Sequence, residues 1–211
     1  MRQRAGLILG VVVLLAGVTA IAGWRWWQGR APYGPDALRA SATLRLVDQA
    51  TADAALEPFD AEIATSDDDQ ILLGRVSWTA PTAPEDTTLR IVLLDQRRHL
   101  LPGFLAVTAP DPEHVSTGLD GSLDDARDRY DWLAGTGTRE SGGSFWGAGN
   151  IITVSSLDAS PVTFQTVLHA ERPDTPAGAR VATAPVTTQD MLIALICVGG
   201  DGRVHWAQRL T

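Results

Sequence analysis

The glycine-rich stretch GGSFWGAGN, residues 142–150, contains the best candidate for a nucleophile in the chain, Ser144. In α/β-hydrolases the nucleophilic serine lies between two glycines, because the tight strand-to-helix turn has no room for larger side chains. Here Trp146 occupies the position of the second glycine, and no predicted strand leads into the turn. We therefore expect no enzyme activity from this motif. Ser144, Phe145 and Trp146 are instead expected on a surface loop that could contact a partner.

The histidines and carboxylates do not show the spacing of a metal site. The four histidines are His99, His114, His169 and His205. None belongs to a His-x-x-x-His pair, which would set two zinc ligands on one helix face. The acidic stretches 67–69 and 120–128 lack the alternating ligands and the late glutamate of a calcium loop. We expect no metal and no cofactor, although a carboxylate pair far apart in sequence, as in glycosidases, stays open.

Charge and composition argue against nucleic acid as a partner. All 17 basic residues are arginine, and four of them lie in residues 1–30, which contain no carboxylate. Residues 31–211 therefore carry 25 acidic and 13 basic residues, so a basic surface for phosphates is not expected. The single cysteine, Cys197, lies in the apolar run MLIALICV, which indicates a buried side chain.

An uncharged apolar stretch near the N-terminus predicts a membrane anchor. GLILGVVVLLAGVTAIAG, residues 6–23, contains ten Leu, Ile or Val residues, which favour insertion into a bilayer. As a helix it would span about 27 Å, close to the hydrocarbon thickness of a membrane. We therefore expect residues 1–5 in the cytoplasm, a transmembrane anchor over residues 6–24, and the remainder outside the cytoplasm.

The stretch GWRWWQGR, which follows the apolar run, suits the membrane interface. Indole has a large apolar body and one N–H donor, so it prefers the headgroup layer where the helix leaves the hydrocarbon. Arginine side chains can extend to lipid phosphates at the same level. The expected interface anchor consists of Trp24, Arg25, Trp26, Trp27 and Arg30.

Two alternatives to a simple anchor remain open. A basic start, an apolar centre and the small residues around Ala22 also fit a secretory signal peptide, with release after cleavage near Ala22. Gly6, Gly10 and Gly17 fall near one side of the predicted helix, where small residues let a second membrane helix approach. In that case the protein would be a small subunit of a larger membrane complex.

Residues 25–40 are expected to form an interfacial segment and linker, because APYGPD within them is rich in proline and glycine. Residues 41–211 alternate branched and aromatic runs with turn clusters, which is typical of a sheet protein. The clearest strands are predicted at 44–47, 71–78, 89–95, 104–107, 151–155, 162–169, 191–198 and 203–210. Residues 199–202, GGDG, predict a tight hairpin between the last two strands.

One clear helix is predicted in SLDDARDRYDWLAG. Ser122 can cap it, Asp124 and Asp125 suit its positive first turn, and Gly135 can end it. Its expected apolar face consists of Leu123, Ala126, Tyr130 and Leu133. A weaker helix is indicated over residues 50–57.

Eight short strands with little helix predict a mainly β fold, a two-sheet antiparallel β-sandwich with one short helix. VSWTAP, residues 76–81, resembles a strand common in fibronectin type III domains, which implies an immunoglobulin- or fibronectin-like sandwich. The following strand lacks that family's tyrosines, and the chain lacks the paired cysteines of antibody domains. The expected function is a non-catalytic binding or accessory module of a bacterial envelope. An envelope hydrolase acting through Ser144 or a carboxylate pair is a further alternative.

Overall fold

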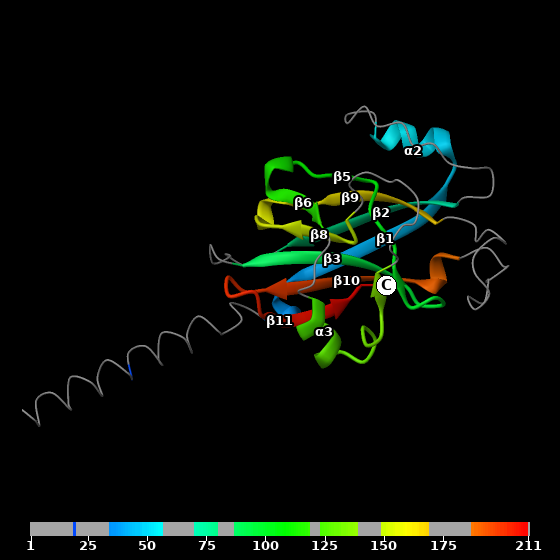
Figure 1. The fold of residues 1–211 in the computed structure, drawn as a ribbon. Helices are drawn as coiled ribbons and strands as arrows, with labels where there is room; N and C mark the ends of the chain where they lie inside the picture. The colour runs from blue at the N-terminus through cyan, green and yellow to red at the C-terminus, as the bar shows by residue number, and fades with distance from the viewer. Residues whose placement is uncertain are drawn as a thin grey trace, which may run out of the picture.

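The computed structural model describes Thr19 and residues 34–56, 70–79, 87–118, 123–138, 149–168 and 187–210. These residues form two β-sheets packed face to face, with one α-helix on the outer side of each sheet (Figure 1). Strand pairs in the described ranges are antiparallel, except for the two-residue pair between β4 and β7. The prediction of a mainly β fold with two antiparallel sheets is therefore confirmed.

The four-stranded sheet has the order β1-β2-β9-β5. Its strands are β1 (Arg39–Val47), β2 (Gln70–Thr79), β9 (Val162–Leu168) and β5 (Ala106–Thr108). β1 pairs with β2 without interruption, from Arg39 opposite Thr79 to Val47 opposite Ile71. β1 and β5 are the edges of this sheet, and β1 is much the longer of the two.

The seven-stranded sheet is built around β3 and β10. Its strands are β3 (Thr88–Asp95), β4 (Leu100–Leu101), β6 (Val115–Gly118), β7 (Gly137–Thr138), β8 (Ile151–Val154), β10 (Met191–Val198) and β11 (Val204–Arg209). β10 lies between β3 and the edge strand β11, while β4 and β8 pair with the other side of β3. Short 3-10 helices are η1 (Pro35–Ala37), η3 (Pro112–His114), η5 (Leu157–Ala159) and η6 (Thr188–Asp190).

The main hydrophobic core fills the space between the sheets, and alternate residues of each inner strand point into it. Trp78 is buried there, and its indole N–H donates to the Leu157 carbonyl at 3.0 Å. Gly74 leaves room for the ring of Phe164, because a side chain at this position of β2 would collide with that ring. Cys197 is fully buried in the same core, as its apolar setting predicted.

A second core covers the outer face of the seven-stranded sheet. α3 (Asp124–Arg129) and the turns after it bury Leu123, Ala126 and Leu133 completely against this sheet. The four residues predicted as the apolar face do pack against this sheet, but the helix ends at Arg129 rather than at Gly135, so Tyr130 and Leu133 lie after it. The backbone of Tyr130 is extended, and the residues after it form turns that end at Gly135, whose φ is +71°.

The four-stranded sheet also carries a helix on its outer face. α2 (Gln49–Leu56) packs Ala52 against Ile71 and Val167 at one end of that face. The Asp48 carboxylate accepts a hydrogen bond from the Thr51 backbone N–H at 2.8 Å. The Thr51 hydroxyl and, to a smaller extent, this backbone bond lower the pKa of Asp48, and the backbone bond caps the helix. The described residues thus contain two α-helices, so the fold prediction with one short helix counted one too few, while the weaker helix indicated over residues 50–57 is confirmed.

Three local features differ from, or refine, the strand predictions. β1 begins at Arg39, inside the stretch expected to be linker, and Leu38 is already buried in the main core. Phe104 forms only an isolated bridge, and the nearby strand starts at Ala106. The hairpin over residues 199–202 is confirmed, with positive φ at Gly202 and an irregularity in the β10–β11 register beyond the loop.

Candidate functional site

The residues predicted to contact the membrane or a partner lie outside the described part of the chain. The interface residues in this group are Trp24, Arg25, Trp26, Trp27 and Arg30. The loop residues are Ser144, Phe145 and Trp146, and the helix-packing residues are Gly6, Gly10 and Gly17. No helix in the described ranges has both the length and the hydrophobicity for a membrane crossing. These site assignments therefore stay predictions.

The described histidines have separate, local surroundings. His99 is exposed in the β3–β4 turn with a positive φ of 52°. His114 Nδ1 lies 2.8 Å from a carboxylate oxygen of Asp111, and this contact raises the pKa of His114. His205 is half-buried on β11, and burial lowers its pKa. Within the described ranges, no three His, Cys, Asp or Glu side chains are grouped as metal ligands.

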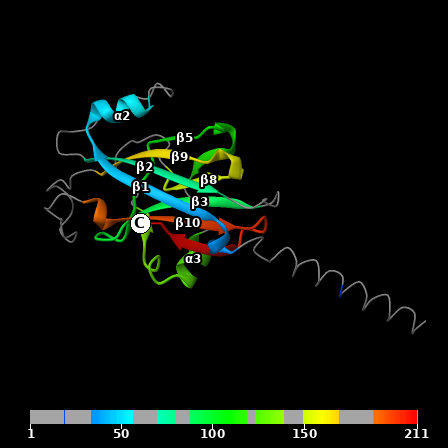
Figure 2. The same cartoon turned by 180° about the vertical axis from the view of Figure 1, so that it is seen from behind.

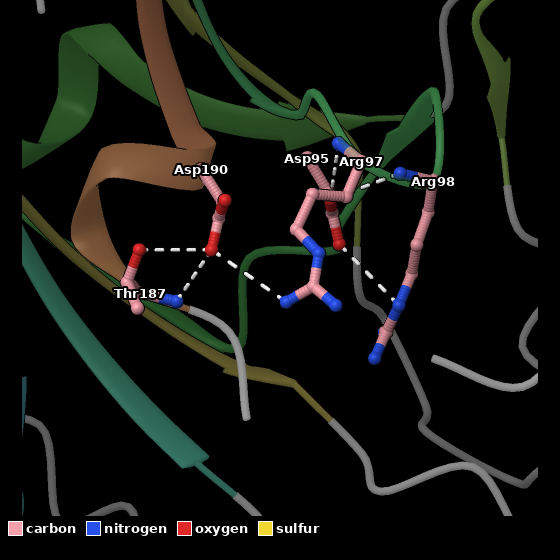
Figure 3. A network of polar contacts seen from close by, with 5 residues as sticks. All are labelled: Asp95, Arg97, Arg98, Thr187 and Asp190. Carbon is pink, nitrogen blue, oxygen red and sulfur yellow. Dashed lines mark hydrogen bonds and ion pairs between the residues drawn. The ribbon is translucent and has the colours of Figure 1, made fainter. Parts of the chain in front are cut away.

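A polar network at one end of the sandwich joins the β3–β4 turn to η6 (Figure 3). The buried Asp95 carboxylate accepts hydrogen bonds from the backbone N–H groups of Arg97 and Arg98, at 3.0 and 3.1 Å. Asp190 accepts from the backbone N–H and the hydroxyl of Thr187, both at 2.8 Å, and these bonds lower the pKa of Asp190. Because both carboxylates hold backbone turns in place, we interpret this network as structural.

The edge strand β11 is covered by side chains from α3 and the residue after it. Asp125 accepts a hydrogen bond from the Val204 backbone N–H at 3.0 Å, and Arg129 donates to the Val204 carbonyl. The Tyr130 hydroxyl accepts from the Ala207 backbone N–H at 2.9 Å. These groups occupy backbone positions that an incoming strand would need.

The edge strand β1 has no comparable side-chain bonds within the described residues, although η6 lies close to it. It pairs there only with β2, and no side chain is bonded to the outer edge of its backbone. In an edge strand, alternate residues direct their N–H and C=O groups away from the sheet. The side chains of Arg39, Ser41, Thr43 and Arg45 are exposed along it. Figure 2 shows β1 running along the near side of the molecule between η1 and α2.

Three exposed arginines share the outer face of the four-stranded sheet. Residues paired across strands point to the same face, and Thr43 is opposite Arg75 while Arg45 is opposite Leu73. Arg45 and Arg75 are thus diagonal neighbours, with Cα atoms about 7–8 Å apart. Arg39 lies on the same face, about 20 Å further along β1. We call these residues the arginine face: Arg39, Arg45 and Arg75.

The arginine face differs from the rest of the described surface in its charge balance. No aspartate or glutamate occurs in the four strands of this sheet. Elsewhere, five described arginines form ion pairs, while the exposed Arg209 has none in the described ranges. The pairs are Arg97–Asp190, Arg98–Asp95, Arg127–Asp124, Arg129–Asp125 and Arg203–Asp201, at 2.9 to 3.7 Å. No residue of the arginine face has an ion pair in the described ranges. In an acidic chain with a net charge of −8, the strands of this sheet therefore present arginines and no carboxylates.

A buried amide lies on the same side of this sheet. Gln165 is opposite Leu73, in the row that begins with Arg45, and it is completely buried. Its side-chain oxygen and nitrogen have no hydrogen-bond partner in the described ranges. Leaving such a group unpaired costs about 1–3 kcal/mol. Nothing in the structure explains why a polar residue is present at this position.

No protein-family model, curated protein or solved structure matches this chain. Sequence reasoning did not single out the arginine face, although the alternation Arg39-x-Ser41-x-Thr43-x-Arg45 was a usable signal for it.

Proposed function

We propose that this protein is a membrane-anchored, non-catalytic binding module of a bacterial envelope, whose exported sandwich binds an anionic partner through the arginine face. The observation that carries this proposal is three exposed arginines, without ion pairs in the described ranges, on a sheet whose four strands contain no carboxylate, in an acidic chain. Unpaired arginines add little to the stability of the fold, whereas they attract and orient an anion.

The location rests on the N-terminal sequence. Residues 6–24 supply the proposed transmembrane helix, and the tryptophans after it supply the interfacial anchor. Between this anchor and β1 lie residues 25–38, which reach at most about 50 Å when fully extended. The partner would therefore be found near the membrane surface. Release after cleavage near Ala22 is the alternative, and it would leave the binding surface unchanged.

A different role is a subunit of a larger membrane complex, favoured by Gly6, Gly10 and Gly17. Purification in a gentle detergent followed by sizing distinguishes it, because a self-standing anchor should elute alone. The immunoglobulin- or fibronectin-like character of the sandwich also belongs to this proposal. It is supported by VSWTAP and by the two-sheet arrangement.

The test of anion binding uses the full-length protein in uncharged detergent micelles and fluorescent dextran sulfate, a polyanion without peptide groups. We expect Arg39→Gln with Arg45→Gln to weaken binding about tenfold, which corresponds to about 1.4 kcal/mol. The matched control is Arg203→Gln with Arg209→Gln, two exposed arginines at β11. The proposal would be contradicted if both double variants lost the same amount of binding affinity. It would also be contradicted if the wild type did not bind dextran sulfate at salt concentrations of roughly 50 mM or below, where exposed charges are little screened.

A further inference from the structure

We infer that the partner of the arginine face is an extended polypeptide segment that adds a strand to β1, with acidic and apolar side chains at alternate positions. This inference rests on the proposed binding role of that face, and it names the class of partner. Strand addition to an open sheet edge is an established mode of peptide recognition, in which the backbone supplies hydrogen bonds and alternate side chains supply specificity.

The backbone of β1 is suited to accept another strand. Its nine residues, Arg39–Val47, contain no proline and keep one register with β2 along their whole length. A strand of this length offers an edge of about 30 Å. The sheet's other edge, β5, has only three residues. β1 is therefore the edge of this sheet that can hold an extended segment.

The two sides of β1 define what an added strand must carry. On the inner side, Ala40, Ala42 and Leu44 are only partly buried at the margin of the main core. Apolar side chains of an added strand would extend that core and cover them. On the outer side, Arg39 and Arg45 are exposed without ion pairs in the described ranges, so acidic side chains placed opposite them would be favoured.

The spacing of the arginines specifies the pattern further. Arg39 and Arg45 are six residues apart, so two carboxylates six residues apart on the added strand would lie opposite both. Arg75 is diagonal to Arg45 on the same face and reinforces the attraction at that end. The expected segment therefore has acidic residues at positions 2 and 8 of nine, with apolar residues at the odd positions.

A second copy of this chain fits the edge less well. If two β1 strands paired antiparallel about Ala42, Arg39 of each copy would lie opposite Arg45 of the other. Like charges directly opposite each other are destabilising. No carboxylate on β1 could offset this repulsion. The charge pattern therefore favours an acidic partner over self-association.

The test uses full-length protein in uncharged micelles and a labelled nine-residue peptide with valine at odd positions, glutamate at positions 2 and 8, and threonine at positions 4 and 6. We expect binding by fluorescence anisotropy that weakens at least tenfold in Arg39→Glu and in Arg45→Glu. Arg209→Glu, which makes the same change on β11, should alter binding less than threefold. The peptide with glutamine in place of glutamate should bind at least tenfold more weakly than the glutamate peptide.

Two further measurements separate strand addition from simple charge attraction. In an added strand, only every second peptide residue directs its N–H group toward β1. N-methylation of these residues should abolish binding, while N-methylation of the residues between them should leave binding unchanged. Alternate β1 backbone amides should also become protected from hydrogen exchange when the peptide binds.

The outcomes distinguish this inference from the proposed function. Binding that depends on the arginines but is indifferent to N-methylation, with no new amide protection on β1, would overturn strand addition and leave anion binding in place. Failure of the peptide to bind while dextran sulfate binds would have the same meaning. Failure of both ligands would overturn the inference and the proposed function together.

Discussion

The edge strands β1 and β11 lie on the same side of the molecule, since η1, directly before β1, contacts β11. The two strands differ in whether side chains are bonded to their outward backbone groups. The outward backbone groups of Val204 and Ala207 on β11 are bonded to Asp125, Arg129 and Tyr130. β1 has no such bonds in the described ranges and carries unpaired positive charge. The comparison indicates that this fold can cover an edge with side chains, and that within the described residues it does so at β11 and not at β1.

The helices on the two outer faces explain how this difference arises. α3 and the turn after it bury Leu123, Ala126 and Leu133 completely, which fixes their polar side chains over β11. α2 buries Ala52 completely and packs it against Ile71 and Val167 on the outer face of the four-stranded sheet. α3 therefore holds polar side chains over the edge of its sheet, whereas α2 packs on the face of its sheet.

The largest expected effect comes from removing the apolar support beneath α3. Leu133→Ala deletes a fully buried side chain and should lower the free energy of unfolding by about 2–5 kcal/mol. It should also loosen the contacts of Tyr130 and its neighbours with β11. The backbone amides of Val204 and Ala207 should then exchange faster in the folded state, at rates closer to those of the outward amides of β1. Chemical denaturation and hydrogen exchange measure the two effects.

The control for this variant is Leu46→Ala on β1, where the side chain is 44% exposed. Its effect on the free energy of unfolding should stay within about 0.5 kcal/mol. If Leu133→Ala destabilised the protein without changing exchange at Val204 and Ala207, the cover of β11 would not depend on the core beneath α3.

A smaller effect is expected when one bond of the β11 cover is removed. Tyr130→Phe keeps the ring beside Trp132, at a centroid distance of 5.7 Å, but removes the acceptor of the Ala207 N–H. The free energy of unfolding should fall by about 1 kcal/mol, the usual net value of one hydrogen bond. The Ala207 amide should exchange faster while the β1 amides are unchanged.

Asp128→Asn on the exposed side of α3 serves as the control for Tyr130→Phe and should be nearly neutral. Unchanged exchange at Ala207 in Tyr130→Phe would show that water replaces the hydroxyl at no cost. The contrast between the two edges would then rest on Asp125 and Arg129 alone.

Much of the fold was readable from the sequence because single strands carry strong local signals. The run MLIALICV is buried at every position of β10, and the glycine-rich loop after it turns the chain into β11. The early start of β1 was not readable. Its first residues, Arg-Ala-Ser-Ala, have little intrinsic preference for strand and follow a proline- and glycine-rich stretch. Pairing with β2 supplies what local preference lacks.

The arginine face could not be derived from sequence for a different reason. Arg45 and Arg75 are thirty residues apart, and only the β1–β2 register makes them diagonal neighbours. The absence of carboxylates from the strands of this sheet becomes visible only when its four members are known. The sequence alone instead predicts a contact surface at the glycine-rich loop around Ser144, and the residues of that loop lie outside the described ranges.

The smallest expected effect concerns pH, and it also separates the two edges. Burial lowers the pKa of His205 on β11 below its ordinary value of 6.5, and Arg129 acts in the same direction while Asp201 opposes it. The unfolded chain therefore binds a proton at His205 more readily than the folded chain does. The contribution of His205 to the free energy of unfolding is complete above pH 6.5, and it is lost as the pH falls through the lower pKa of the folded state. The difference in unfolding free energy between the wild type and His205→Gln should decrease from pH 8 to pH 5.

His114 provides a control of opposite sign, because the nearby Asp111 carboxylate raises its pKa. Its contribution is complete below pH 6.5 and is lost as the pH rises through the raised folded pKa, so the difference between the wild type and His114→Gln should increase from pH 8 to pH 5. β1 carries arginines, which stay charged throughout this range. Binding of dextran sulfate by the arginine face should therefore change less between pH 8 and pH 5 than the contribution of His205 to the free energy of unfolding does. If the two histidine variants changed the pH dependence of the unfolding free energy in the same direction, the opposite surroundings of His114 and His205 would not explain it.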